Sequence, residues 1–478
     1  MRERVCHLPS PPAKIFLVGV GGIGMSGLAQ LLVHQGYEVA GSDRQMSGPG
    51  RDELFEKLTS IGIALFSQDG TGPRSFAPDL LVASAAVEED NPDFVAAPDT
   101  RRLGRAQALA SALNRTETIQ IAVAGSCGKT SVTGWLGCSL RALGYPVLVV
   151  NGGYVLDFET ARSAGNFHAD PSPRFSVYEV DESDKSLVEF QPDHGLLLNI
   201  GADHYERSEL LDVFGRFLDR CRESVTLPAD LLQDFSAHGP RMRGCFATGS
   251  EPVADADHCM IPSEYAARRG GASFSLSGFP GQRFEVCQHG AHSAINAAAV
   301  AALLGQVLEM PCTGIDMQTA LASFTGVRQR FELMGQTACG LPVYNDYAHN
   351  PDKIAAAIAT AREAGGGGVL AFFQPHGFGP LGFMRDSLKT QLAESLQAGD
   401  RFLLLPVYYA GGSSSFRPTS GEVAQAFAED GLPVEFCATR VSAEALVAKA
   451  RGIGAVLVLG ARDPSLPSWT RTLTECKL

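Results

Sequence analysis

Three times along this chain, a short apolar segment ends in a glycine-rich or polar turn and is followed by a helix-like segment. This order begins near residues 15, 121 and 341. A buried parallel strand is a continuous apolar run, and a helix usually connects it to the next parallel strand. A chain of 478 residues is also too long for one hydrophobic core. We therefore predict an α/β fold with three domains, each built on a mainly parallel sheet.

The composition is typical of a globular protein and excludes several classes. Hydrophobic residues make up 45% and charged residues 19% of the chain, which argues against disorder. The net charge of −13, with acids and bases interspersed, offers no basic surface for nucleic acid or an anionic membrane. Eleven dispersed cysteines, no signal peptide and no long apolar run predict a cytoplasmic protein. We expect a monomer or homodimer that binds neither nucleic acid nor membrane.

The first glycine turn has the spacing GxGxxG and lies between a predicted strand at 15–18 and a predicted helix at 25–32. An acidic residue ends the next strand. Backbone N–H groups at such a turn bind diphosphates, although the glycines could serve only a tight turn. The motif predicts a diphosphate ligand without identifying it as NAD. The candidate substrate-binding residues are Gly19, Gly21, Gly22, Ile23, Gly24, Ser42 and Asp43.

The second turn, "GSCGKT", follows the predicted strand 121–124 and begins a predicted helix. Its backbone N–H groups would face an incoming phosphate, Lys129 could reach the β- and γ-phosphates, and the Thr130 hydroxyl could bind Mg²⁺. The alternative is a surface lysine in a glycine-rich turn. The candidate nucleotide-binding residues here are Gly125, Ser126, Cys127, Gly128, Lys129, Thr130 and Ser131.

Acidic residues end two further predicted strands of this segment. They are Glu179, Asp181, Glu182 and Asp184 in "YEVDESD", and Asp203, next to His204, in "NIGADH". Alone, each cluster would be read as a solvated strand end. Because nucleotide-bound Mg²⁺ needs a few hard oxygen ligands, their combination with a phosphate loop predicts a magnesium site.

The order of seven motifs resembles the Mur ligase family, and most closely its alanine-adding branch, with the tripeptide-adding branch second. They are the glycine-rich first segment, the shortened phosphate loop, "EVDESD", "NIGADH", "HSAINAA", "GVRQRFE" and "NDYAHNP". The family spells its phosphate loop GTHGKT, so "GSCGKT" is a variant of it. The resemblance implies a Rossmann-like UDP-sugar domain at 1–112, a central P-loop ATPase domain with extra strands at 113–325, and a Rossmann-like C-terminal domain at 326–478.

The resemblance also implies the reaction. ATP would phosphorylate the carboxylate of UDP-N-acetylmuramate or an analogue, and an amino acid, expected to be L-alanine, would displace the phosphate to form an amide. Lys129 would neutralise the transferring phosphoryl group, Thr130 and Glu179 would hold one Mg²⁺, and His204 would hold a second. Asn296 would contact adenine, Arg330 and Asp346 the nucleotide, and His349 the acyl phosphate. Tyr347 and His376 are further candidate substrate-binding residues.

The chain departs from the family where the amino acid would bind. The family's "FQPHRYTRT" has two arginines that face the amino acid, and this chain has Gly377 and Pro380 in their places. A "GAG" loop near the end is replaced by "GARDPS". An unpaired buried carboxylate is costly, so we expect Arg385, the next cation along, to substitute. The alternative is a surface arginine paired with Asp386.

Three other functions stay open. A Mur-type ligase could add a different amino acid or a peptide. An NAD-dependent oxidoreductase would explain GxGxxG but neither the phosphate loop nor the acidic clusters. A non-catalytic UDP-sugar-binding paralogue would have no use for Lys129, Glu179, His204 and Asp346, the set that phosphoryl transfer requires.

Overall fold

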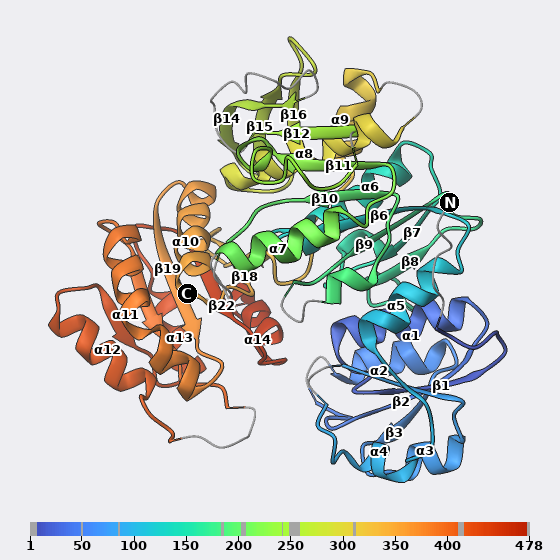
Figure 1. Ribbon diagram of the computed structural model, residues 1–478. Helices are drawn as coiled ribbons and strands as arrows, with labels where there is room; N and C mark the ends of the chain where they lie inside the picture. Colours follow the sequence, from blue (N-terminus) through green and yellow to red (C-terminus); the bar gives the residue numbers. More distant parts are fainter. Residues whose placement is uncertain are drawn as a thin grey trace. The chain divides into compact units, whose positions relative to one another are not determined.

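The computed structural model describes most of the chain, in two compact units (Figure 1). The described residues are 7–48, 51–84, 87–182, 186–201, 207–240, 242–247, 259–308, 312–409 and 415–475. Unit 1 falls within 1–266, 272–287 and 291–327, and unit 2 within 267–271, 288–290 and 328–478. Both units are α/β structures with mainly parallel sheets, so the predicted fold class is confirmed.

The first sheet of unit 1 has five parallel strands in the order β3-β2-β1-β4-β5. Its elements are β1 (Lys14–Val18), α1 (Ile23–His34), β2 (Glu38–Asp43), α2 (Arg51–Ser60), β3 (Ala64–Ser67), α3 (Thr71–Phe76), β4 (Leu80–Ala83), α4 (Pro92–Ala96), β5 (Arg102–Gly104) and α5 (Arg105–Asn114). Residues 15–18 of the central strand are fully buried, because helices cover both faces of a parallel sheet.

The second sheet of unit 1 has eight strands in the order β13-β12-β11-β10-β6-β9-β7-β8, with only β8 antiparallel to its neighbour. A three-stranded sheet, β14-β15-β16, adjoins it in sequence. The strands are β6 (Ile119–Ala124), β7 (Val147–Val150), β8 (Phe167–Ala169), β9 (Phe175–Glu179), β10 (His194–Leu197), β11 (Ser224–Pro228), β12 (Met242–Phe246), β13 (Cys259–Met260), β14 (Pro262–Arg268), β15 (Gly271–Leu276) and β16 (Arg283–Val286). The helices are α6 (Lys129–Ala142), η1 (Leu156–Phe158), η2 (Ser186–Glu189), α7 (Arg207–Leu218), η3 (Ala229–Leu231), α8 (Ala291–Val307) and α9 (Gly314–Ala322). The Trp135 ring stacks on Phe324 where α6 and α9 pack together.

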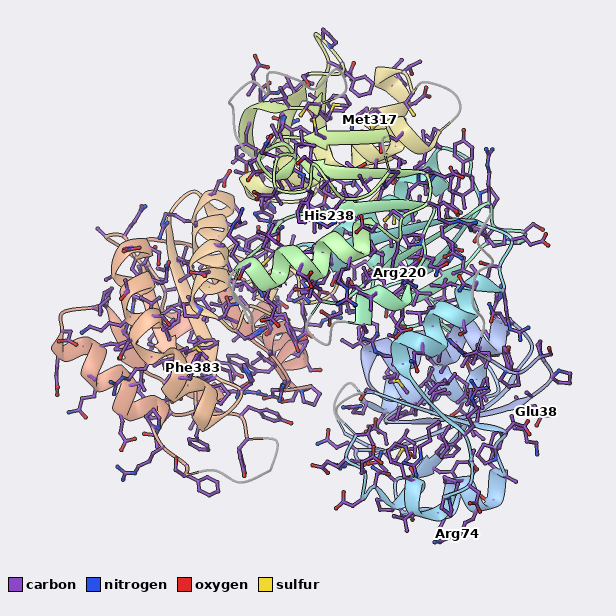
Figure 2. The ribbon with its side chains drawn as sticks, viewed as in Figure 1. Glu38, Arg74, Arg220, His238, Met317 and Phe383 are labelled. Carbon is purple, nitrogen blue, oxygen red and sulfur yellow. The ribbon has the colours of Figure 1, made fainter. Side chains whose placement is uncertain are left out.

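Unit 2 has a six-stranded sheet in the order β17-β18-β22-β19-β20-β21, in which β17 is antiparallel to β18 and the other pairs are parallel. Its elements are β17 (Glu332–Gln336), β18 (Pro342–Asp346), α10 (Pro351–Gly365), β19 (Gly368–Gln374), α11 (Phe378–Ser395), β20 (Arg401–Leu404), α12 (Ser420–Glu429), β21 (Val434–Phe436), α13 (Arg440–Ala448), β22 (Ile453–Gly460), α14 (Leu466–Thr472) and η4 (Leu473–Glu475). Side chains fill the spaces between its sheet and helices (Figure 2).

Each strand that the apolar runs predicted is present, in both units. The strands β3, β7, β8, β11, β12, β13, β14, β17 and β21 have no counterpart in the sequence analysis, because no motif flanks them. Across the described ranges, no helix combines the length and the apolar character needed to cross a membrane.

Buried amide contacts join the two larger sheets of unit 1. The side chain of Asn166, which is fully buried, donates to the Ile23 carbonyl oxygen at 2.7 Å and to Ser26 Oγ at 2.8 Å. Its own carbonyl oxygen accepts from Gln30 Nε2 at 2.9 Å. All three partners lie on α1, the helix that follows GxGxxG. The segment before β8 is therefore bound to the start of this helix.

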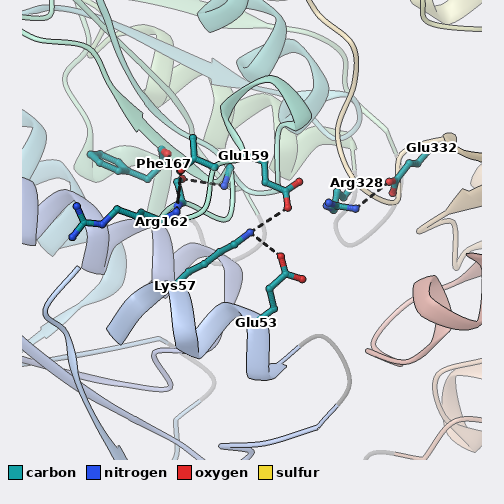
Figure 3. A network of polar contacts seen from close by, with 10 residues as sticks. Glu53, Lys57, Glu159, Arg162, Phe167, Arg328 and Glu332 are labelled. Atoms are coloured by element: carbon teal, nitrogen blue, oxygen red, sulfur yellow. Dashed lines mark hydrogen bonds and ion pairs between the residues drawn. The ribbon is translucent and has the colours of Figure 1, made fainter. Parts of the chain in front are cut away.

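A partly buried ion pair reinforces this junction (Figure 3). Lys57 Nζ on α2 lies 2.8 Å from Glu53 and 3.2 Å from Glu159, which follows η1. These carboxylates raise the pKa of Lys57 against the opposing effect of its partial burial. Nearby, Arg162 Nη2 donates to the Ser60 carbonyl oxygen at 2.9 Å.

We expect Asn166→Ala to lower the free energy of unfolding by about 3 kcal/mol, because it leaves buried polar groups of α1 without a partner. Urea unfolding monitored by circular dichroism measures the change. The control is Gln425→Ala, which removes an exposed amide on α12 and should cost less than about 0.5 kcal/mol. Equal stability of the two variants would contradict the inferred role of Asn166.

Candidate active site

The phosphate loop lies between β6 and α6, and two of its glycines have a backbone that other residues rarely adopt. Gly125 has φ 136° and Gly128 has φ 87°. Asn199, just after β10, fixes the loop: its Oδ1 accepts from the Cys127 N–H at 2.8 Å and its Nδ2 donates to the Cys127 carbonyl at 2.9 Å. The Ser126 hydroxyl accepts from the Gly201 N–H at 2.9 Å. The loop is thereby held open at the N-terminus of a helix, where an anion is favoured.

Lys129, the first residue of α6, points back across this loop. Its ammonium group lies 2.6 Å from the Gly125 carbonyl oxygen and 2.6 Å from Glu182 Oε2. Asp181 Oδ1 is 3.9 Å away. Part of the acidic cluster that was predicted as a metal site therefore serves as the counterion of Lys129. A phosphate in the loop would compete with these carboxylates for the same ammonium group.

Thr130 and Glu179 meet at a pair of glycines that the sequence analysis did not select. A Cβ at Gly152 would lie 1.7 Å from Glu179 Oε1, and a Cβ at Gly153 would lie 2.7 Å from Thr130 Cγ2. The turn after β7 thus lies against both predicted magnesium ligands and leaves room for their side chains. Among the described residues, no group of three or more His, Cys, Asp or Glu side chains forms a metal cluster. His204, the third predicted ligand, lies outside the described residues.

Asn296, on α8, lies beside the same loop. A Cβ at Gly128 would be 3.5 Å from Asn296 Oδ1. Ser131 follows Thr130 in the first turn of α6. The fold therefore gathers Asn296, Glu179 and the whole predicted loop, 125–131, at one end of the eight-stranded sheet.

The glycine turn of the first sheet gathers the predicted substrate-binding residues at the ends of β1 and β2. The Ser42 carbonyl accepts from the Gly19 N–H at 2.8 Å, and Asp43 Oδ2 accepts from the Gly21 N–H at 2.9 Å. Gly22 is the N-cap of α1, which begins at Ile23 and contains Gly24. Two arginines that the motif did not indicate lie here as well: Arg51 Nη1 donates to the Gly21 carbonyl at 3.1 Å, and a Cβ at Gly24 would be 3.0 Å from Arg105.

The remaining predicted residues belong to unit 2. Asp346, at the end of β18, accepts the N–H groups of Phe331 and Ala348, both at 2.7 Å. Burial raises the pKa of Asp346, and the positive charge of Arg330 opposes this shift. The Arg330 guanidinium lies 4.8 Å from the ring centroid of Tyr347. Arg330, Asp346 and Tyr347 are thus neighbours.

Two histidines lie together beyond the ends of β18 and β19. His349 Nδ1 donates to the Tyr347 carbonyl at 3.0 Å, and the His349 and His376 ring centroids are 5.3 Å apart. Burial, together with the nearby charges of His349 and Arg462, lowers the pKa of His376 to about 4. His376 is therefore neutral at neutral pH.

Arg385 occupies the second turn of α11. Its Nε donates to Asp386 Oδ1 at 3.0 Å, and its side chain is 51% exposed. This is the surface pairing that the sequence analysis left open as the alternative to substrate binding. Phe383, on the same helix, is 95% exposed (Figure 2).

We expect the stability of the chain to fall as the pH is lowered from about 6.5 to 4, in part because of His376. In this range an unfolded histidine, with its pKa near 6.5, takes up a proton that the folded His376 does not, so the unfolded state is favoured. His376→Gln should flatten the decline of Tm, measured by differential scanning fluorimetry. Phe383→Ala, a surface change in the same unit, should leave the slope unchanged. An identical slope for His376→Gln and the unmodified chain would contradict the lowered pKa.

Comparison with known proteins gives matches along almost the whole chain. A model of the Mur ligase family catalytic domain matches residues 14–116, and a model of the Mur ligase glutamate ligase domain matches residues 329–462. A UDP-N-acetylmuramate–L-alanine ligase of Acidithiobacillus ferrooxidans is 33% identical over 468 residues, covering 94% of this chain and 95% of the relative. One of Myxococcus xanthus is 32% identical, covering 94% and 93%.

A solved structure shares the fold. The UDP-N-acetylmuramate–alanine ligase of Thermotoga maritima superimposes with a TM-score of 0.77 at 24% identity, covering 97% of this chain and 98% of that one. The family predicted from seven ordered motifs is confirmed, and the oxidoreductase alternative is thereby set aside. The chain belongs to the Mur ligase family of ATP-dependent, amide-forming ligases.

Proposed function

We propose that this chain joins L-alanine to the carboxylate of UDP-N-acetylmuramate, with ATP and Mg²⁺, through an acyl phosphate. The relatives described above are named for this reaction. The observation that carries the proposal is the position of Lys129, whose ammonium group crosses an open phosphate loop between the Gly125 carbonyl and Glu182. A lysine that served only as a surface residue would not be expected to make both of these contacts.

In this proposal, the carboxylate oxygen of the substrate attacks the γ-phosphorus of ATP, and ADP leaves. The amine of alanine then attacks the acyl carbon, inorganic phosphate leaves, and the amine loses a proton. Lys129 exchanges its two oxygen partners for phosphate oxygens and stabilises the charge that moves to the leaving ADP. The backbone N–H groups of the loop, held by Asn199, orient the phosphates without needing to rearrange.

Thr130 and Glu179 suit a magnesium ion. Both offer hard oxygen ligands, and Gly152 and Gly153 leave the space that their side chains occupy. When bound, Mg²⁺ supplies positive charge to the phosphate oxygens. Thr130 and Glu179 would hold one such ion, and His204 is proposed as a ligand of a second.

The residues of the first sheet fit a UDP-sugar. The N–H groups at 19–24 and the helix N-terminus favour a diphosphate, and Arg51 and Arg105 add positive charge beside them. Asp43 is engaged by the Gly21 N–H. We propose the domain bounds 1–112, 113–325 and 326–478 for the UDP-sugar, ATP and C-terminal domains.

In unit 2, we propose that Arg330 and Asp346 contact the nucleotide and that His349, with Tyr347 and His376, lies beside the acyl phosphate. The carboxylate of Asp346 already accepts two backbone N–H groups, which fix its orientation. His376 is neutral, so it can donate or accept a hydrogen bond without adding charge.

A Mur-type ligase with another amino acid or a peptide as acceptor is the second candidate. The observation that favours it is the absence of a cation at Gly377 and Pro380, where the resemblance to the family implies arginines. A phosphate-release assay with UDP-N-acetylmuramate, ATP and a panel of amino acids and peptides decides between the two.

We expect Lys129→Ala to lower ATP-dependent phosphate release by about a hundredfold or more, because the lost charge acts mainly in the transition state. The measurement is coupled phosphate release with UDP-N-acetylmuramate and L-alanine. Lys449→Ala, which removes an exposed lysine of unit 2, is the control and should retain full activity. Near-normal release by Lys129→Ala, with circular dichroism showing an intact fold, would refute the phosphate-clamp role. No release by the unmodified chain would favour the non-catalytic paralogue.

Gly152→Ala should weaken the dependence on Mg²⁺, because the new methyl group would displace the Glu179 carboxylate. We expect the Mg²⁺ concentration for half-maximal activity to rise about tenfold. Gly305→Ala is the control, since a Cβ at this position of α8 meets nothing within 4 Å and should leave the Mg²⁺ titration unchanged. Identical titrations for the two variants would argue against Glu179 as a magnesium ligand.

A further inference from the structure

Three neighbouring strands of unit 2 end in one group of basic side chains. The sheet order places β22 between β18 and β19, and Gln374 pairs with Gly460 at the last step of the β19–β22 register. His376 and Arg462 each lie two residues beyond this pair, at equivalent positions past adjacent strand ends. His349 follows the strand on the other side, and its ring contacts that of His376. Arg462 is therefore carried by the strand between the two histidines.

Arg462 keeps its charge available for a ligand. Its side chain is exposed, and it forms no hydrogen bond or ion pair within the described ranges. The adjacent acid, Asp463, is already engaged: Arg440 Nη2 lies 2.7 Å from its Oδ2, and Ser465 N–H donates to its Oδ1 at 2.9 Å. Burial and, to a smaller extent, the charges of His349 and Arg462 lower the pKa of His376, in keeping with the adjacent positions of Arg462 and His376 at the strand ends.

The backbone of Arg462 is strained. Its φ is 68°, a left-handed conformation that favours glycine. Such strain is kept where the surrounding structure imposes it, often at a functional site. Here the Asp463 contacts with Arg440 and Ser465 hold the turn. A glycine would satisfy the backbone better, so the fold alone does not call for an arginine here.

We propose that Arg462 binds the carboxylate of the incoming amino acid, an inference that rests on the proposed ligase function. Because His376 is neutral, it cannot balance a carboxylate, whereas a guanidinium binds one through two parallel hydrogen bonds. The positions that carry arginine in the family are Gly377 and Pro380 here. Arg385 is less suited, because its guanidinium is already paired with Asp386 on α11.

The test compares L-alanine with L-alaninamide, which lacks the carboxylate, in the phosphate-release assay. We expect Arg462→Ala to raise the KM for L-alanine about tenfold to a hundredfold, as for the loss of a charged hydrogen-bonded pair, and to leave the KM for ATP unchanged. The ratio of kcat/KM for alanine to kcat/KM for alaninamide should fall by the same factor. Arg451→Ala is the matched control, since Arg451 lies two residues before β22 as Arg462 lies two residues after it.

A second variant, Arg462→Gly, distinguishes an effect on substrate binding from an effect on folding. It removes the side chain and relieves the left-handed backbone, so Tm should be unchanged or higher while the KM for alanine rises. The inference would be overturned if both Arg462 variants kept the original ratio of kcat/KM for alanine to kcat/KM for alaninamide. It would also be overturned if Arg385→Ala raised the KM for alanine and Arg462→Ala did not. An equal loss with both acceptors would assign Arg462 to the phosphate instead and also overturn it. If the unmodified chain releases no phosphate with any acceptor, the proposed function itself has failed.

Discussion

The turn between β6 and α6 depends on two glycines with positive φ, and the nucleotide end of the molecule depends on that turn. With side chains at Gly125 or Gly128, the backbone would be strained, and a Cβ at Gly125 would also come within 3.0 Å of Leu198. The turn directs the first N–H groups of α6 into one concave loop and places Lys129 across its opening. Glu182 and the Gly125 carbonyl hold this lysine, which keeps a partly buried charge paired.

Asn166 holds the other glycine turn, which precedes α1, in place. It fixes the start of α1 from the side of the eight-stranded sheet, so the UDP-sugar loop and the phosphate loop belong to one compact unit. A buried amide is well suited to this, because it satisfies a backbone carbonyl, a hydroxyl and another amide at once. Small displacements of a bound carboxylate relative to ATP reduce the rate of transfer, so rigidity at this junction contributes to function.

The sequence predicted those parts of the site that a single segment specifies. The strands at 15–18 and 121–124 are apolar runs, and the glycine turns after them carry their own spacing, so both loops could be located before the structure was known. The sequence could not show that Gly152 lies against Glu179. These residues are far apart in the chain, and only the strand order β6-β9-β7 brings the ends of their strands together. For the same reason, the role of Glu182 as the partner of Lys129 was missed. Arg51 could not be identified from the sequence as a neighbour of this turn, because nothing in GxGxxG requires a cation 30 residues later.

In unit 2, the first turn of α11 has little means of binding a carboxylate. Its N-cap, Gly377, has no side chain to offer, and Pro380 has no N–H. Arg462 starts instead from the end of the central strand, on a turn that Arg440 and Asp463 hold in place. Because the backbone of this turn is held, it has less conformational freedom to lose when Arg462 binds a carboxylate, which is a physical reason for keeping a strained arginine where a glycine would fit.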